Sequence, residues 1–285
     1  MVKISEILAD LGLTSKASQR VFRRGTRDVE DLTVWRDDVS GIIFIDDFYV
    51  GNGTYESGVY RTDDDTVSYE DVVDTDRRLK AYRQYYAAKD VCDVGCGAGR
   101  FIQAASEFAA NASAVELQSD FAIALNDTGV PCAREITALG QNFDTVFMFQ
   151  SFEHMNEPLK VLSDVRACLR SGGQLVVEVP HANDFLISEL ECSPFIDFTL
   201  WSQHLVLHTR DSLKRMLRHC GFQSVSIESV QRYPLSNHLH WLNKGAPGGH
   251  KSPLSAIDSP DLNAAYENAL RKIDRTDTLV AIAQA

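Results

Sequence analysis

The sequence has no long apolar run. No stretch of eighteen consecutive apolar residues occurs among its 285 residues, whereas a helix that spans a membrane needs about twenty. The first residues, MVKISEILADLGL, also lack the apolar segment and small-residue cleavage site of a signal peptide. We therefore expect a soluble, cytoplasmic protein without a membrane span.

Positive charge is scarce as well. The chain carries 28 lysines and arginines against 40 aspartates and glutamates, which gives a net charge of −12. A protein that grips a nucleic-acid backbone needs a basic face. The composition therefore argues against a nucleic-acid partner.

Cysteine pairs of the metal-binding type are absent. None of the six cysteines has a partner at C-x-x-C spacing. We interpret them as structural thiols in a reducing compartment. No spacing of histidine, cysteine and acidic residues forms a convincing metal triad, so we expect no metal site.

The most informative stretch is Val91–Phe101, which reads VCDVGCGAGRF. A short apolar strand runs into a glycine turn, and the turn opens a helix with Phe101, Ile102, Ala105 and Phe108 on one face. Glycines let backbone N–H groups approach a ligand closely. Strand, glycine loop and helix in this order predict a nucleotide-type site.

The glycine spacing separates two kinds of cofactor. Dinucleotide sites carry G-x-G-x-x-G, but Gly95, Gly97 and Gly99 give G-x-G-x-G, with Asp93 two residues before them. Glu116 follows the next strand, about twenty residues on, where an acid holds a ribose. A ribose occurs in both kinds of cofactor, so Glu116 fits either one.

With its acid and three glycines, the stretch resembles the first motif of the class I S-adenosylmethionine-dependent methyltransferases, D-x-G-x-G-x-G. The resemblance covers roughly residues 80 to 285. It implies that S-adenosylmethionine lies against the glycine loop and that Glu116 holds its ribose. The implied cofactor-binding residues are Asp93, Gly95, Gly97, Gly99, Glu116 and Gln150. The family often has an aspartate after the third strand to meet the adenine, whereas this sequence has only Glu135–Ile136.

Alternating strands and helices predict an α/β fold with helices on both faces of an open sheet. The resemblance implies a Rossmann-like, seven-stranded, mostly parallel sheet whose last strand is antiparallel. We divide the chain into residues 1–79, an N-terminal helix with an aromatic cap, and residues 80–285, the methyltransferase domain. An insert at 232–275 precedes the last strand.

The N-terminal region allows two interpretations. Ile4, Ile7, Leu8 and Leu11 mark an amphipathic helix that is either a cap or a contact in a homodimer. The extended, aromatic segment 35–61 is either a hairpin covering the core or a lid whose Tyr55 and Tyr60 reach a substrate. We interpret the acidic run 63–76 as a solvated loop.

Catalysis would need a base only for a weakly nucleophilic acceptor such as a hydroxyl. His154 follows the fourth strand of the sheet, where ligands of open α/β sheets bind. The alternative is that its ring merely lines the pocket. His204 is the rival base, and His181 follows the fifth strand.

The insert combines flat rings with cationic and polar groups. It resembles the corresponding segment of bacterial methyltransferases associated with surface polysaccharides, which implies a sugar or sugar-phosphate acceptor. A connector without a ligand is the alternative. The candidate acceptor-binding residues are Tyr55, Tyr60, His181, Tyr233, His238, Trp241, Lys244, His250 and Lys251.

We therefore predict an S-adenosylmethionine-dependent methyltransferase that modifies a hydroxyl of a sugar, a sugar nucleotide or another polar small molecule. The enzyme alternative is N- or C-methylation of a small metabolite that is not a sugar. A second alternative is a cofactor-binding protein without catalysis.

Overall fold

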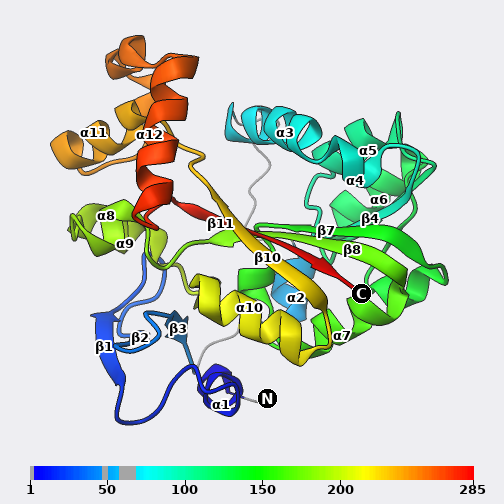
Figure 1. The fold of residues 1–285 in the computed structure, drawn as a ribbon, viewed down its shortest axis with the longest axis horizontal. Helices are drawn as coiled ribbons and strands as arrows, with labels where there is room; N and C mark the ends of the chain where they lie inside the picture. Colours follow the sequence, from blue (N-terminus) through cyan, green and yellow to red (C-terminus); the bar gives the residue numbers. More distant parts are fainter. Residues whose placement is uncertain (1–2, 47–50, 58–68) are drawn as a thin grey trace. The chain divides into compact units, whose positions relative to one another are not determined.

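The computed structural model describes residues 3–46, 51–57 and 69–285 (Figure 1). Tyr60, one of the predicted lid residues, lies outside this part. The chain forms two compact units. Unit 1 comprises Met1–Tyr49, Val179–Arg215 and Ile227–Val280, and unit 2 comprises Val50–Glu178, Met216–Ser226 and Ala281–Ala285.

The fold contains a seven-stranded sheet, as the resemblance to the methyltransferases implies. Its strands run in the order β10 (Gln223–Val230), β11 (Thr278–Gln284), β8 (Leu169–Pro180), β7 (Phe143–Phe149), β4 (Asp90–Val94), β5 (Asn111–Val115), β6 (Cys132–Ala133). The pairs of β4 with β5 and β7, of β5 with β6 and of β7 with β8 are parallel. The sheet is thus mostly parallel, with the last strand antiparallel.

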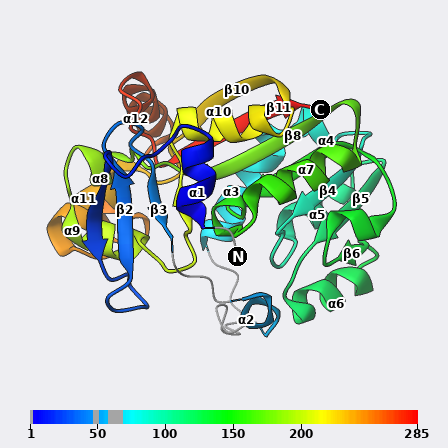
Figure 2. The same cartoon turned by 90° about the horizontal axis from the view of Figure 1, so that it is seen from below.

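The helices of unit 2 are α2 (Asn52–Glu56), α3 (Tyr69–Ala81), α4 (Arg83–Tyr86), α5 (Arg100–Ser106), α6 (Ser119–Asp127) and α7 (Pro158–Cys168), with the 3₁₀ turns η1 (Ile136–Leu139) and η2 (Phe152–His154). Helices lie on both faces of the parallel strands. Figures 1 and 2 show α4 and α5 on one face and α7 on the other. Phe101 of α5 meets Phe147 and Phe149 of β7 edge-on, with ring centroids 5.1 and 4.9 Å apart.

Unit 1 contains a second, four-stranded sheet in the order β1 (Gln19–Arg24), β2 (Thr33–Asp37), β3 (Ile43–Ile45), β9 (Val206–Leu207). Its strand pairs are antiparallel. Its core joins Val34, Ile43 and Leu207 of the sheet to Ile187 of α8 (Phe185–Ser188) and Ile196 of α9 (Ser193–Thr199). The other helices and turns of unit 1 are α1 (Ile4–Asp10), α11 (Leu235–Lys244), η3 (Gly249–Lys251), η4 (Pro253–Ile257) and α12 (Pro260–Lys272). The residues of α10 (Arg210–His219) are divided between unit 1 and unit 2.

The structure corrects four local predictions. Residues 52–56, predicted to be extended, form α2, and α3 begins at residue 69, inside the predicted loop. In the sequence, Gly172 and Gly173 are predicted to end the helix that carries Leu162 and Leu169, but they do not cap α7. They lie in β8, where the register against β7 is irregular: Leu169 pairs with Phe143 and Gln174 with Thr145, so four residues of β8 lie opposite one of β7. Phe108 follows the end of α5 and is 45% exposed instead of joining its buried face.

Within the described part of the chain, no helix combines the length and the apolar character that a membrane crossing requires.

A buried carboxylate fastens α3 to the sheet. Glu178 of β8 is 0% exposed and accepts two hydrogen bonds of 2.8 Å from the Arg77 guanidinium. Arg78 Nε donates to the same carboxylate over 2.9 Å, and the Tyr82 hydroxyl donates over 2.7 Å. Burial opposes the charge, but the two guanidinium groups and the hydroxyl outweigh it and hold the pKa of Glu178 well below its usual range. Glu178 is therefore ionised in the folded protein at neutral pH.

We expect Glu178→Gln to lower the free energy of unfolding at pH 7 by about 3–5 kcal/mol, because two guanidinium groups lose their buried counter-charge. The depressed pKa of Glu178 means that its contribution is fully present above the ordinary glutamate pKa of about 4.3 and is lost as the pH falls toward the folded value. The difference between wild type and variant in urea melts should therefore shrink below about pH 4. Lys160→Ala, which removes an exposed pair with Asp164, is the control and should change little. Equal stability of Glu178→Gln and wild type at pH 7 would contradict this account.

Candidate functional site

The glycine loop is anchored to the neighbouring strand. After β4, Gly95 N–H and Cys96 N–H both donate to the Val115 carbonyl of β5, over 2.8 and 3.2 Å. Gly95 and Gly97 have φ of 75° and 58°, a left-handed conformation that favours glycine. The loop therefore crosses the end of β5 in a fixed conformation.

Glu116 holds this loop from the end of β5. One carboxylate oxygen accepts the Gly97 N–H over 2.7 Å, and the other accepts the Gln118 N–H over 2.8 Å. The predicted ribose-binding acid therefore lies directly beside the predicted glycine loop. Each carboxylate oxygen can accept a second hydrogen bond, so Glu116 can hold the loop and also accept from the hydroxyls of a ribose.

Asp93 is a buried acid with spare hydrogen-bonding capacity. It is 3% exposed, and its Oδ1 has no hydrogen-bond partner within the described residues. Burial raises the pKa of Asp93 to about 7, although the positive charge of Arg78 opposes this shift. A buried carboxyl with an unsatisfied oxygen suits a ligand that brings an ammonium group. The amino-acid end of S-adenosylmethionine carries such a group.

Gln150 ends β7 in an unusual backbone conformation. Its φ is 51°, which is rare for a residue other than glycine, and its N–H donates to the Glu178 carbonyl over 2.8 Å. Its Nε2 is buried and makes no hydrogen bond with any described residue. A strained backbone and an unsatisfied amide donor are the features expected of the predicted cofactor contact.

Packing around the loop explains two of its glycines. A Cβ on Gly95 would lie 2.6 Å from Ser151 Cβ, and Ser151 Oγ donates to the Val94 carbonyl over 2.8 Å. A Cβ on Gly99 would lie 2.3 Å from a methyl group of Leu125 in α6. Gly99 therefore has no room for a side chain beside Leu125, whatever the loop binds.

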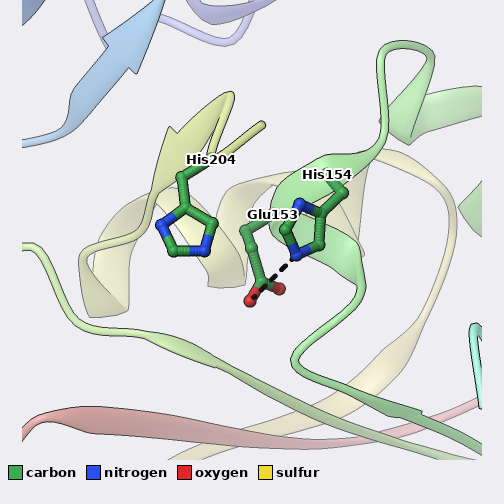
Figure 3. A group of neighbouring side chains, drawn as sticks. All are labelled: Glu153, His154 and His204. Carbon is green, nitrogen blue, oxygen red and sulfur yellow. Dashed lines mark ion pairs between the residues drawn. The ribbon is translucent and has the colours of Figure 1, made fainter. Parts of the chain in front are cut away.

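His154 lies just beyond the same strand end, in η2. Its Nε2 is 3.9 Å from Oε1 of Glu153, which is 1% exposed (Figure 3). Tyr55 of α2 meets the His154 ring edge-on, with ring centroids 6.5 Å apart. Unit 2 thus brings a predicted lid residue and the predicted base together, beside a buried carboxylate.

The other predicted histidines belong to unit 1. The Nδ1 of His204 lies 3.0 Å from the Thr199 carbonyl, so in the neutral ring it carries the proton and Nε2 carries the lone pair. His181 has the same arrangement with the Thr276 carbonyl at 2.9 Å. Burial lowers the pKa of His204 and of His181 to about 4, so both rings are neutral at pH 7.

The predicted acceptor-binding residues of the insert have different surroundings within unit 1. Trp241 is 3% exposed, and the rings of Phe195 and Phe198 pack against it. His238 is buried, stacks on Phe185 and has its Nδ1 2.6 Å from the Tyr266 hydroxyl. The remaining four keep accessible surface, with Lys244 and Lys251 exposed and Tyr233 and His250 half-buried.

Sequence reasoning missed Arg78, Ser151 and Glu153. Arg78 Nε holds Glu178, its guanidinium lies 4.5 Å from the Phe149 ring centroid, and its charge acts on Asp93. The only signal for Arg78 in the local sequence is that Arg77 and Arg78 directly follow the acidic run 63–76. Ser151 and Glu153 lie within three residues of His154. Ser151 acts through Val94, which is distant in sequence, whereas Glu153 lies beside His154 itself.

Comparison with known families and structures agrees with this geometry. A family model described as "Methyltransferase domain" matches residues 74–227, more than half of the chain. A search of curated proteins finds no match to the chain.

Solved structures resemble the fold. An S-adenosylmethionine-dependent methyltransferase from Archaeoglobus fulgidus is 19% identical, with a TM-score of 0.53, over 76% of this chain and 95% of its own. A methyltransferase from Thermotoga maritima, described as a possible histamine N-methyltransferase, is 15% identical, with a TM-score of 0.48, over 75% and 89%. Phosphoethanolamine N-methyltransferase 2 of Haemonchus contortus, in complex with S-adenosylmethionine, is 15% identical, with a TM-score of 0.49, over 84% and 61%. At these identities the likeness extends to the fold and not to the acceptor.

The packing of Gly99 can be tested without any ligand. Gly99→Ala should lower the free energy of unfolding by about 2 kcal/mol or more, because the new methyl group meets Leu125 and φ is 71°. In the background of Leu125→Ala the same change should cost at least ~1 kcal/mol less, since the clash is gone and only the backbone strain remains. Chemical denaturation of the two single variants and the double variant measures this coupling. Purely additive effects would show that packing against Leu125 does not require the glycine.

Proposed function

This chain belongs to the methyltransferase-domain family, and on that premise we propose that it methylates a hydroxyl group of a small polar molecule, a sugar or sugar nucleotide. The cofactor is S-adenosylmethionine, which supplies an electrophilic methyl group when bound. The observation that carries the hydroxyl assignment is the pairing of His154 with the buried Glu153 just beyond the end of β7.

Unit 2 has the donor and acceptor groups that this cofactor needs. We assign the ribose hydroxyls to Glu116 and the backbone contacts to Gly95 and Gly97. Asp93 and Gln150, each with an unsatisfied buried atom, provide an acceptor for an ammonium group and a donor for an oxygen. Gly99 contributes through packing.

A hydroxyl is a poor nucleophile until a base takes its proton, and an imidazole is suited to that role at neutral pH. A carboxylate beside the imidazole orients the ring and stabilises the cation formed when it accepts the proton. Glu153 is buried, with its Oε1 3.9 Å from His154 Nε2, so it acts on the ring through its charge and favours the protonated imidazole. We assign Tyr55 to the acceptor because its ring lies beside His154.

The insert supports a polar and anionic acceptor. Lys244 and Lys251 are exposed cations, and Tyr233 and His250 keep part of their surface accessible. We assign these four residues to acceptor choice, with a phosphate as the partner of the two lysines. Surface-polysaccharide synthesis remains the setting that such an acceptor suggests.

Cofactor binding is tested by calorimetry. S-adenosylmethionine should bind and NADH should not. Glu116→Ala should weaken binding by roughly 1.5–3 kcal/mol, because charge-assisted hydrogen bonds are lost, and Gly97→Asp should abolish it. Glu107→Ala, which removes an exposed carboxylate at the end of α5, is the matched control and should bind normally. Tight NADH binding with no response to the methyl donor would refute the cofactor assignment.

The acceptor is tested by measuring release of S-adenosylhomocysteine across a panel of sugar nucleotides, sugar phosphates, amines and other small metabolites. With a hydroxyl acceptor, His154→Ala should lower turnover ~10²–10⁴-fold and leave cofactor affinity unchanged. His204→Ala is the matched variant, and a loss confined to it would move the base to unit 1.

Other outcomes separate the alternatives. Turnover with an amine and full activity of both histidine variants would favour N-methylation by positioning alone. Cofactor binding without turnover on any acceptor would favour a binding protein that lacks catalysis.

A further inference from the structure

The Arg78 side chain lies near the carboxyl ends of three adjacent strands. Phe149 of β7 pairs with Glu178 of β8, and Phe147 of β7 pairs with Asp93 of β4. Paired residues project on the same face of a sheet, and so do residues two apart on one strand. The side chains of Glu178, Phe149 and Asp93 therefore share one face. Arg78 Nε donates to Glu178, and the guanidinium lies 4.5 Å from the Phe149 ring centroid.

Arg78 carries more donors than the protein uses. A guanidinium has five N–H groups in a planar fork. Nε donates to Glu178, but the four N–H groups of Nη1 and Nη2 make no hydrogen bond with any residue in the described part of the chain. The side chain is only 13% exposed. Charged groups with so little exposure are normally paired, so the unused half of the fork is suited to an anionic ligand.

The adjacent Arg77 is arranged differently. Its Nη1 and Nη2 both donate to Glu178 over 2.8 Å. Its Nε and Nη2 also donate to Asp74, over 3.3 and 3.2 Å. The two arginines thus share one buried counter-ion, and Arg78 is the one that keeps both Nη groups for a ligand.

The amino-acid end of S-adenosylmethionine is a zwitterion, and its ammonium group is assigned to Asp93. Its carboxylate needs donors close by. A guanidinium fork matches a carboxylate in geometry and can hold both oxygens at once. The charge of Arg78 lowers the pKa of Asp93 against the effect of burial, so the two side chains are near enough to hold the neighbouring charges of one amino acid.

We propose that Arg78 is a further cofactor-binding residue, whose Nη groups hold the carboxylate of S-adenosylmethionine while Nε stays on Glu178. Glu178 is then a positioning residue, because its hydrogen bond fixes the orientation of the fork. The inference depends on the cofactor and is independent of the acceptor proposed above.

The test compares two ligands by calorimetry on the full chain. One is S-adenosylmethionine, and the other is its decarboxylated form, which lacks the carboxylate and keeps the ammonium, the sulfonium and the nucleoside. Wild type should bind the decarboxylated form at least ~10-fold more weakly, since charge-assisted hydrogen bonds are lost. Arg78→Met should bind the two ligands within ~3-fold of each other, because it lacks the fork that distinguishes them.

Two control variants separate this contact from stability and from general charge. Arg77→Met removes a partner of the same buried carboxylate, and Arg100→Met removes an exposed cation at the start of α5. Both should keep the wild-type ratio of the two affinities, and urea melts report their stability. Should Arg78→Met fail to fold, Arg78→Lys keeps the charge beside Glu178 without the planar fork, and its ratio should fall at least ~3-fold.

Four results would overturn the proposal. One is equal affinity of wild type for the two ligands. Another is a wild-type ratio in Arg78→Met or Arg78→Lys. The third is a ratio that falls equally in Arg77→Met or Arg100→Met. The fourth is an unchanged affinity of Arg78→Met for S-adenosylmethionine together with a raised KM for the acceptor, which would move Arg78 to the acceptor. A wild type that binds neither ligand is a different result, since it refutes the cofactor assignment itself.

Discussion

The buried carboxylate of Glu178 is the interaction on which the ligand-facing end of unit 2 depends. Its side chain holds Arg77, Arg78 and Tyr82, so α3 and the start of α4 cannot leave the sheet without exposing an ion cluster. Its backbone carbonyl accepts the Gln150 N–H and thereby fixes the strained end of β7. One residue thus positions both the covering helix and a predicted cofactor contact.

The same ion cluster influences the charge of Asp93, one of the predicted cofactor-binding residues. Arg78 lies between two acids: it neutralises Glu178 by direct contact and acts through space on Asp93. Asp93 is left with a pKa near neutrality and an unsatisfied oxygen. A ligand that brings a positive group resolves both conditions, because it supplies the donor and favours the ionised form.

Parts of the fold with a strong local pattern were predictable. β7 is an almost fully buried strand of seven residues. Apart from Asp144 and Thr145 its residues are apolar, so the strand can be recognised from the sequence of Phe143–Phe149. The motif containing Asp93, the glycines and Glu116 was equally readable, because spacing alone carries it. α3 was missed at its first turns, since a polar helix held by long-range ion pairs looks like a solvated loop. Trp241 resembled a ligand platform in sequence, yet Phe195 and Phe198 pack against it, and no local pattern indicates such partners.

The glycines of the loop have different tasks, so a substitution at each has a different meaning. Gly99 has no space for a side chain beside Leu125, whereas Gly97 carries the N–H that Glu116 accepts and is one of the two residues assigned to the backbone contacts of the cofactor. A related chain that keeps only the third glycine of the motif keeps a requirement of packing. Retention of Gly97, Glu116 and Gln150 together is therefore a better criterion than Gly99 for recognising a chain that binds the cofactor.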